Sequence, residues 1–463
     1  MASLAQFEGN KSQKVGSATL MDDVTLINPL TSRGWRLPPL GLLYVASYLE
    51  KHGVTVKIID PMSEGEECYR SESRYTGITC MSSQFAKTKE VARRVKDTNP
   101  ETTIVVGGVH PTVSTEEVLS DPNIDVAVVG EGEKAMLNIV SEGVKKGVVC
   151  GERIRNLDDI PFPARHLINM EWYLRRDSTV VSKWLRATYM ITSRGCPFHC
   201  AFCINSKHEM FGNVVRYNSA SYVESEVEEL VSSYGIKGIY FADDAFTANK
   251  NRLTELCRRI RHFDLQWNCM SRVDSLNKPL LELMKESGCV SIGFGVESGS
   301  QKVLNALNKK ARVEDAIRIF DLCRETGIKT WATVIVGNPE ETADDLRLTD
   351  KLLDRLKPDS VGIYFLTPFQ GTAIHDMAVE NGWHVSKDAD WFIEGPQMEI
   401  NFTENELREI WRTLMKRHSH RLGFLRSYFM NPYFVLDLTR QVLTRPSSLL
   451  GWINGNEGLF QRD

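Results

Sequence analysis

The chain has 463 residues, with 42% hydrophobic and 25% charged residues, which is the composition of an ordinary globular protein. Its formal net charge of −4 excludes the large basic excess of a nucleic-acid-binding protein. We expect neither a transmembrane segment nor a signal peptide, because no apolar run reaches about 18 residues and the N-terminus has no apolar core. Ten cysteines without the spacing of a disulfide framework favour a reducing, cytoplasmic compartment. At about 100–200 residues per domain, this length predicts two or three domains.

Residues 1–21 are polar and small, and we expect a disordered tail there. The first domain is expected over residues 22–150, where short apolar strands alternate with amphipathic helices. The predicted strands are 24–28, 54–60, 75–80, 103–106 and 126–129, and the predicted helices are 40–52 and about 85–97. Alternation of this kind predicts a parallel sheet with helices on both faces. Ligands of such sheets bind beyond the carboxyl ends of the strands, where the strand order switches.

Two glycine-containing segments follow strands of this domain and are candidate ligand contacts, because glycine lets a ligand approach the backbone closely. The first contains Gly107, Gly108, His110, Pro111 and Thr112, and the second contains Gly130, Glu131 and Gly132. A pair of glycines also occurs in plain tight turns between strand and helix, so neither segment names a ligand by itself.

A linker is expected over residues 151–184, where two prolines in the run 161–163 prevent regular strand pairing. After an apolar strand at 187–192 comes a CxxxCxxC run. Its members are Cys196, Cys200 and Cys203. Three thiolates on one loop can hold an iron–sulfur cluster and leave one iron without a protein ligand. The alternative is a structural zinc loop completed by His199 or His208, but such sites usually pair two CxxC-like knuckles and the sequence has no second one.

CxxxCxxC with the aromatic Phe202 before its last cysteine resembles the radical S-adenosylmethionine superfamily. In that superfamily, the unique iron of a [4Fe-4S] cluster chelates the amino and carboxylate groups of S-adenosylmethionine. The two glycine segments, placed ahead of this loop, resemble the cobalamin-binding domain of the cobalamin-dependent members, which are class B methyltransferase-like enzymes. A vestigial domain without a cofactor is the alternative.

The DxHxxG signature, whose histidine ligates cobalt in other cobalamin proteins, is absent, and His52 and His110 stand in a different context. The resemblance therefore implies that the lower face of cobalamin meets residues from the loops after the strands. The candidates are Met81, Ser82, Ser83, Gln84 and Trp35.

The second domain is expected over residues 185–370. Its predicted strands are 187–192, 238–242, 266–271, 291–296, 333–337 and 360–366, separated by helices such as 221–234 and 313–326. Six strand–helix units fall short of the eight that close a barrel. The resemblance implies a partial (β/α)6 barrel that is open on one side to admit substrate. The expected fold class is α/β, with a Rossmann-like cobalamin-binding domain, this barrel and a mainly helical C-terminal segment.

Polar residues follow four of these strands, and the resemblance implies that they contact S-adenosylmethionine. They are Asp243 and Asp244 for the amino group, Arg272 with Ser271 for the carboxylate, Glu297 and Ser298 for the ribose or amino-acid part, and Gly337 with Pro339 for adenine. The aspartates could instead cap a helix, and Arg272 could form a structural ion pair.

The C-terminal segment, 371–463, is predicted to be mainly helical and to shape the substrate pocket, with the apolar stretch 428–443 packed over the open side of the barrel. The basic run 416–421 is typical of a solvated helix face.

The resemblance implies an enzyme in which the cluster reduces S-adenosylmethionine to methionine and a 5′-deoxyadenosyl radical. A methyl group then passes from methylcobalamin to an unactivated carbon, or less often to phosphorus. The substrate is a small molecule or a peptide or protein side chain such as glutamine, and an external donor such as flavodoxin or ferredoxin supplies electrons. The alternatives are a cobalamin-dependent cyclase or ring-rearranging enzyme without methyl transfer, and a non-catalytic cobalamin sensor.

Overall fold

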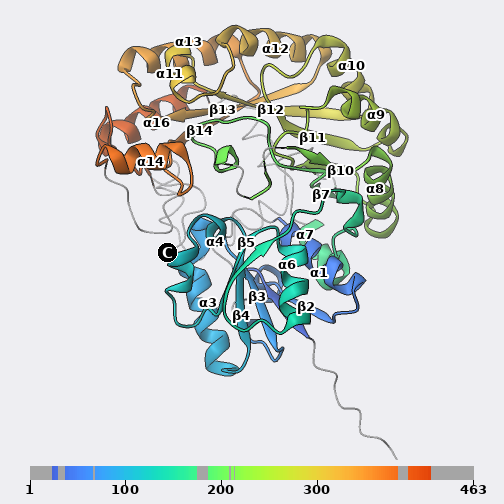
Figure 1. Ribbon diagram of the computed structural model, residues 1–463. Helices are drawn as coiled ribbons and strands as arrows, with labels where there is room; N and C mark the ends of the chain where they lie inside the picture. Colours follow the sequence, from blue (N-terminus) through green and yellow to red (C-terminus); the bar gives the residue numbers. More distant parts are fainter. Residues whose placement is uncertain are drawn as a thin grey trace, which may run out of the picture.

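The computed structural model describes residues 23–29, 37–65, 68–174, 186–207, 210–212, 214–383 and 395–418. Two six-stranded parallel sheets organise this part of the chain (Figure 1). The expected tail 1–21, the candidate Trp35, the zinc alternative His208 and the stretch 428–443 lie outside the described residues.

The first sheet has the strand order β2-β1-β3-β4-β5-β6, and every neighbouring pair is parallel. Its strands are β1 (Val24–Ile27), β2 (Val56–Ile59), β3 (Tyr75–Thr79), β4 (Thr103–Gly107), β5 (Val126–Gly130) and β6 (Gly147–Gly151). The connecting helices are α1 (Leu40–Lys51), α2 (Pro61–Glu64), α3 (Phe85–Thr98), α4 (Val109–Val113), α5 (Thr115–Leu119) and α6 (Gly132–Glu142). Because β2 and β3 lie on opposite sides of β1, the order switches between β1 and β3, and a ligand is expected beyond their carboxyl ends.

Helices cover both faces of this sheet, as the alternating pattern predicted. One buried core gathers residues of α1 and α6, and a second core, on the other face, gathers residues of α3 and α5. Strand β6 was not predicted. It lies at the edge of the sheet, where its residues are only partly buried or exposed, and its short apolar run, 148–150, stands between two glycines.

The second sheet contains the six predicted strands in consecutive order, all parallel, which confirms the expected partial barrel. They are β7 (Ala187–Met190), β10 (Gly238–Phe241), β11 (Gln266–Ser271), β12 (Cys289–Glu297), β13 (Lys329–Val336) and β14 (Ser360–Phe365). Its helices are α8 (Ala220–Tyr234), α9 (Lys250–Ile260), α10 (Lys278–Glu286), α11 (Gln301–Ala306), α12 (Val313–Thr326) and α13 (Ala343–Leu356). Figure 1 shows these helices as an outer arc, with the first domain on the opposite side of the second sheet. Strands β7 and β14 are the two edges, so the sheet stays open within the described residues.

Polar caps explain where several of these helices begin. Ser219 accepts a hydrogen bond from the backbone nitrogen of Tyr222 (3.1 Å) before α8, and Asn277 caps α10 in the same way. Thr342 and Asp345 form a reciprocal capping box at the start of α13. Each cap satisfies amide groups that have no partner inside the helix, and so fixes the direction in which the chain leaves the preceding strand.

The described part of the segment between the two sheets, 152–174, contains the 3₁₀ turns η3 (Leu157–Asp159) and η4 (Arg165–Leu167) and the helix α7 (Met170–Leu174). Apolar side chains of 154–164 extend the core of the first domain, whereas those of α7 join the core of the second sheet. Arg165 forms a fully buried ion pair with Glu226 of α8 (2.5 Å), which ties this segment to the second domain.

The described part of the C-terminal segment contains α14 (Ala373–Glu380) and α16 (Glu404–His418). Trp411 of α16 donates to the carbonyl oxygen of Ile363 (2.9 Å), so α16 packs on β14. The basic run 416–421 is described only as far as residue 418. Lys416 and Arg417 are exposed, as a solvated face requires, although Arg417 pairs with Asp350 of α13. His418 is buried against the same aspartate, so for this residue the interpretation is wrong. No helix among the described residues is long and apolar enough to cross a membrane.

Candidate functional site

The three motif cysteines lie on the loop after β7, held on either side by the short antiparallel strands β8 (Ser193–Arg194) and β9 (Arg216–Tyr217). All three thiols are free; Cys200 is buried, and Cys196 and Cys203 are partly exposed. Burial, together with the charges of Cys200, Asp244 and Cys196, raises the pKa of Cys203 to about 12. The sulfur atoms therefore lie close enough to interact, and binding a metal here requires the loss of their protons.

Neighbouring segments fix the backbone of this loop. Ala201 donates from its backbone nitrogen to the carbonyl oxygen of Leu307 (2.9 Å). The side-chain amide of Asn308 donates to the carbonyl oxygen of His199 (2.6 Å). Within the described residues, no group of three or more His, Cys, Asp and Glu side chains is already placed so that it could hold a metal ion. The described part of the loop offers three free thiols as donors.

The aspartates after β10 have different environments. Asp243 is buried and accepts hydrogen bonds from the backbone nitrogen and hydroxyl of Thr192 (both 3.0 Å) and from the hydroxyl of Ser193. Its carboxylate thus holds the start of the cysteine loop, and burial raises its pKa. Asp244 is exposed, and its charge contributes to the raised pKa of Cys196 and Cys203. Of the two candidates, Asp244 is the one whose carboxylate faces the cysteines and remains accessible.

Arg272, after β11, lies against the cysteine loop. Its guanidinium pairs with Asp274 (2.8 Å), donates to the carbonyl oxygen of Lys309 (2.8 Å) and lies 3.9 Å from Sγ of Cys200. The structure therefore contains the ion pair that was the alternative to carboxylate binding, and it also places the positive charge of Arg272 beside Cys200. The neighbouring Ser271 exchanges hydrogen bonds with the hydroxyls of Thr247 and Ser275 (2.8 and 2.9 Å).

Glu297 and Ser298, at the end of β12, use their side chains within the protein. Glu297 is buried, adopts a φ of 61°, and pairs with the buried Lys309 (2.6 Å). A non-glycine residue in this conformation stores strain, and such residues cluster at functional sites. The hydroxyl of Ser298 accepts from the backbone nitrogen of Ser300 (3.1 Å) and lies 3.2 Å from that of Thr349.

At the end of β13, Gly337 has a φ of +84°, and a Cβ there would stand 3.3 Å from the side chain of Leu407 in α16. The backbone nitrogens of Gly337 and Asn338 both donate to Glu341, at 2.7 and 3.1 Å. Burial raises the pKa of Glu341 to about 7. Pro339 is buried in the same turn. The turn is therefore a fixed backbone surface beside the barrel opening.

The candidates of the first domain gather beyond the carboxyl ends of β3, β4 and β5. Gly108 has a φ of +115°, and a Cβ there would stand 2.8 Å from the carbonyl oxygen of Cys80. The hydroxyl of Thr112 donates to the carbonyl oxygen of Gly108 (2.7 Å) and accepts from the nitrogen of Gly130 (3.0 Å). These bonds join the loop after β4 to the loop after β5.

The loop after β3 is held in a similar way. Gln84 is buried and donates to the carbonyl oxygen of Pro29 (3.2 Å), which joins the two sides of the strand-order switch. Ser82 lies 3.3 Å from Nδ1 of His110, and burial lowers the pKa of this histidine. The side chain of Met81 is 53% exposed, so among these candidates it presents an open surface to a ligand at this edge. Ser83, Gly107 and Gly132 are partly buried, and Pro111 is buried.

The carboxyl edge of the first sheet faces the cysteine loop of the second domain. Thr112 lies 3.5 Å from the sulfur of Met210, and Ser114 contacts Gln370 of the loop after β14. From α1, Tyr44 donates to the carbonyl oxygen of Ile191 (3.0 Å), just after β7. The expected ligand edge of one domain therefore lies against the segments that carry and follow the cysteine loop of the other.

The side chain of Glu131, which the sequence suggested as a ligand contact, is used within the protein. Its carboxylate is buried and forms ion pairs with Arg194 and Arg216, which flank the cysteine loop. In this structure it therefore joins the two domains, and only its backbone remains for a ligand. The sequence did not identify the residues that pair with these buried carboxylates: Arg194 and Arg216 with Glu131, and Lys309 with Glu297. The only signal in the sequence was that Arg194 lies two residues before Cys196.

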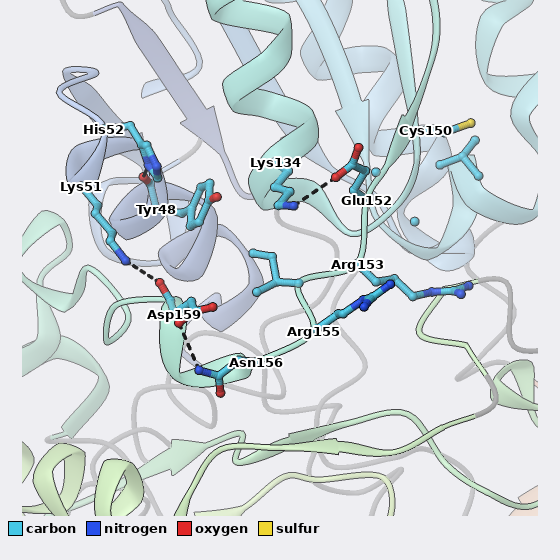
Figure 2. Close-up of a pocket in the computed structure, with 14 residues that line it drawn as sticks. Tyr48, Lys51, His52, Lys134, Cys150, Glu152, Arg153, Arg155, Asn156 and Asp159 are labelled. Atoms are coloured by element: carbon cyan, nitrogen blue, oxygen red, sulfur yellow. Dashed lines mark hydrogen bonds and ion pairs between the residues drawn. The ribbon is translucent and has the colours of Figure 1, made fainter.

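A polar groove of about 830 Å³ lies beside this junction, between α1, α6 and the segment after β6 (Figure 2). Lys134 pairs there with Glu152 (3.0 Å), and Lys51 donates to the carbonyl oxygen of Asp159 (2.7 Å). None of the motif cysteines lines the groove, so it is distinct from the site between the domains.

Comparison with known proteins agrees with this geometry. The family model of the radical SAM superfamily matches residues 190–353, and that of the B12-binding domain matches residues 30–140. An uncharacterized methyltransferase from Pyrococcus horikoshii is 33% identical over 373 residues, which are 74% of this chain and 79% of that protein. The chain belongs to the cobalamin-dependent radical SAM methyltransferases.

Two further relatives cover most of the chain. Cytidylyl-2-hydroxyethylphosphonate methyltransferase from Streptomyces wedmorensis is 27% identical and covers 81% of this chain and 85% of its own length. The solved structure of the radical S-adenosylmethionine methyltransferase TsrM from Kitasatospora setae has a TM-score of 0.65 at 19% identity, with 78% of each chain covered. The latter likeness supports the fold.

The family assigns three cofactors to this methyltransferase: a [4Fe-4S] cluster, S-adenosylmethionine and cobalamin. The residues present fit them. Three free thiols on one loop form the donor set of a cluster with one open iron. Gly108, where a Cβ would meet backbone, and the exposed Met81 lie at the edge where a large planar ligand approaches the strand ends. Together these cofactors supply a carbon radical and a transferable methyl group, chemistry that side chains lack.

Proposed function

We propose that this protein is a C-methyltransferase that methylates an unactivated carbon after hydrogen abstraction from it. The observation that carries the proposal is that the glycine-rich edge of the first domain lies against the segments that carry and follow the cysteine loop, through contacts of Thr112 and Tyr44. Such a reaction needs the radical source and the methyl source to reach the same carbon. Two domains whose candidate cofactor segments face each other meet that requirement.

Within this proposal, Cys196, Cys200 and Cys203 ligate the cluster. Asp244 accepts from the ammonium group of S-adenosylmethionine, since its carboxylate is exposed beside the cysteines. The backbone at Gly337 lies against adenine, and the loops after β3, β4 and β5 bind cobalamin. The remaining side chains hold these segments and exclude water from the reacting atoms.

The substrate is proposed by class alone: a small molecule, or a peptide or protein side chain such as glutamine. An external one-electron donor such as flavodoxin or ferredoxin reduces the cluster. The ten cysteines, all free among the described residues, support function in a reducing compartment.

The test is product analysis of the anaerobically reconstituted holoenzyme with candidate substrates. We expect S-adenosylhomocysteine, 5′-deoxyadenosine and a substrate that carries one added methyl group, with the label recovered when the methyl of S-adenosylmethionine is deuterated. The Cys200→Ala variant is the negative control. A reaction that yields 5′-deoxyadenosine and altered substrate, but never S-adenosylhomocysteine or label, contradicts the proposal.

A cyclase is the second candidate. An anaerobic magnesium-protoporphyrin IX monomethyl ester cyclase from Rubrivivax gelatinosus is 27% identical over 361 residues, which are 72% of this chain and 64% of that protein. For a cyclase, 5′-deoxyadenosine would be the only nucleoside product of S-adenosylmethionine, so the same product analysis separates the two functions.

A further inference from the structure

Four buried charges join the first domain to the strands that flank the cysteine loop. Glu131 and Glu133 lie at the start of α6, directly after β5, and Arg194 and Arg216 face each other across β8 and β9. Arg194 is 2.5 Å from Glu133 and 3.4 Å from Glu131. Arg216 makes two bonds to the carboxylate of Glu131, one of them at 3.1 Å. We call these four residues the interdomain clamp.

The clamp is shielded from solvent. The side chains of Glu131 and Glu133 are 1% and 4% exposed, and those of Arg194 and Arg216 are 11% and 12% exposed. Interactions between charges in such surroundings are screened little by salt, and a two-point bond between a guanidinium and a carboxylate also fixes their relative orientation.

Further contacts hold the clamp in place. Arg216 donates to the carbonyl oxygen of Ile154 (2.5 Å), and the guanidinium of Arg194 lies 5.4 Å from the centre of the Tyr44 ring. At Gly151 a Cβ would overlap the carbonyl oxygen of Glu131, so β6 packs directly on the turn that carries this carboxylate. Tyr44, Thr112 and Ser114 of this edge also contact the second domain, each through a single hydrogen bond between uncharged groups.

Stability alone does not account for buried charges at this junction, because apolar side chains of similar volume often serve as well or better. Ion pairs with this geometry also fix the relative orientation of the two segments that they join. Arg194 is separated from Cys196 by one residue, so the carboxylates of the first domain act on the beginning of the metal-binding loop. The same carboxylates come directly after β5, whose carboxyl end belongs to the edge where cobalamin is expected.

We propose that Glu131, Glu133, Arg194 and Arg216 are positioning residues that set the cysteine loop at a fixed place relative to the carboxyl edge of the cobalamin domain. This inference rests on the proposed function, since the separation matters because the radical and the methyl group must reach one carbon. Loosening the clamp leaves each cofactor bound but misaligns the two half-sites. Misplacement by about 1 Å can cost about 100-fold in rate.

The test uses the reconstituted holoenzyme with Glu133→Gln and, separately, Arg194→Lys. Iron and cobalamin contents should match the wild type. We expect the ratio of 5′-deoxyadenosine to S-adenosylhomocysteine to rise about tenfold or more, because hydrogen abstraction continues while methyl transfer fails. We also expect the magnetic interaction between cob(II)alamin and the reduced cluster, seen by electron paramagnetic resonance, to weaken or broaden.

Glu226→Gln is the matched control, because it breaks the Arg165–Glu226 pair, which is buried even more completely than the clamp and lies between η4 and α8 rather than at the cysteine loop. This variant should lose stability but keep the wild-type product ratio and spectrum. If the Glu133→Gln and Arg194→Lys variants also lose only stability, the clamp is structural and the proposal is overturned.

Should Glu133→Gln fail to fold, the double variant Glu131→Gln with Arg216→Gln leaves no unpaired charge and is held to the same criteria. The spectroscopic readout does not depend on the substrate. If the wild type makes no S-adenosylhomocysteine, the proposed function fails, while an altered spectrum in the clamp variants and not in Glu226→Gln still supports the positioning role.

Discussion

The guanidinium carbon of Arg272 lies 3.8 Å from the centre of the Phe198 ring, so the cation packs on an aromatic side chain inside the CxxxCxxC loop. The same guanidinium is 3.9 Å from Sγ of Cys200. The buried Lys309 is a second cation near this thiol, and the charge of Cys200 contributes to its raised pKa. Two positive charges therefore lie near the thiol of Cys200, which we propose as a cluster ligand.

Arg272→Gln is expected to make the reduction potential of the cluster more negative, because a nearby positive charge stabilises the reduced, more negative cluster. An anaerobic redox titration followed by electron paramagnetic resonance measures the shift. Arg272→Lys should retain most of the wild-type potential. Arg261→Gln should leave it unchanged, because Arg261 forms an exposed pair with Glu286. Equal potentials in Arg272→Gln and the wild type would contradict this account.

The motif cysteines are expected to be individually essential for the cluster. Cys196→Ala, Cys200→Ala and Cys203→Ala should each lose most of the bound iron and all cleavage of S-adenosylmethionine, because the described part of the loop offers these three thiols as donors. Iron and sulfide analysis with the assay of 5′-deoxyadenosine checks this. Cys150→Ala is the control, since Cys150 is exposed on β6, and it should retain both. Retained cleavage in a motif variant would refute the ligand assignment.

Lys309→Met should destabilise the protein by about 3–5 kcal/mol, because it leaves the buried carboxylate of Glu297 without its partner. Chemical denaturation of the cofactor-free protein measures the free energy of unfolding. The double variant Lys309→Met with Glu297→Gln should recover part of this loss. Lys278→Ala, which removes an exposed pair with Glu325, should change little. A loss in Lys309→Met no larger than that of Lys278→Ala would disprove the role of this pair.

Gly108→Ala should destabilise the first domain, because the position has a φ of +115° and a Cβ would stand 2.8 Å from the carbonyl oxygen of Cys80. We also expect less cobalamin to be retained after gel filtration, since the loop after β4 would move. Gly41→Ala is the matched control. It lies within α1 with nothing within 4 Å of a Cβ, and alanine there should stabilise the protein by about 0.5–1 kcal/mol. Both effects are measured by chemical denaturation and by gel filtration with cobalamin. An unchanged denaturation midpoint for Gly108→Ala would show that the loop accommodates the Cβ.

The strands could be predicted because each is a short apolar run bounded by turn residues, and their parallel order followed from the alternation with helices. Edge strand β6 was not predicted, since its apolar run, 148–150, is short and stands between two glycines. For the candidate site residues, the sequence predicted that they follow the carboxyl ends of strands, but it did not predict which group each side chain contacts. Asp243 and Asp244 are adjacent, yet one is buried under Thr192 and the other is exposed.

Long-range pairing explains the remaining differences. Glu131 meets Arg216 across 85 residues of sequence, and Lys309 meets Glu297 only because a loop with left-handed residues at 308 and 310 turns back over the cysteines. Sequence spacing carries no signal for such contacts. The charged residues that the sequence suggested as ligand contacts therefore fall into two groups. Asp243 and Glu297 bind other parts of the protein, whereas Asp244 remains open to a ligand.

Glu341 gives a pH-dependent prediction. Burial raises its pKa from 4.5 to about 7, so the folded protein binds a proton there that the unfolded chain has already lost between these values. Stability from this group is therefore greatest at low pH and falls by about 3 kcal/mol as the pH rises from about 4.5 through about 7. Denaturation of cofactor-free Glu341→Gln at pH 5 to 8 should show a flatter profile than the wild type. The glutamine carbonyl oxygen can still accept from Gly337 and Asn338, so the turn is kept. Parallel profiles for the two proteins would mean that Glu341 is already ionised in the fold at pH 5.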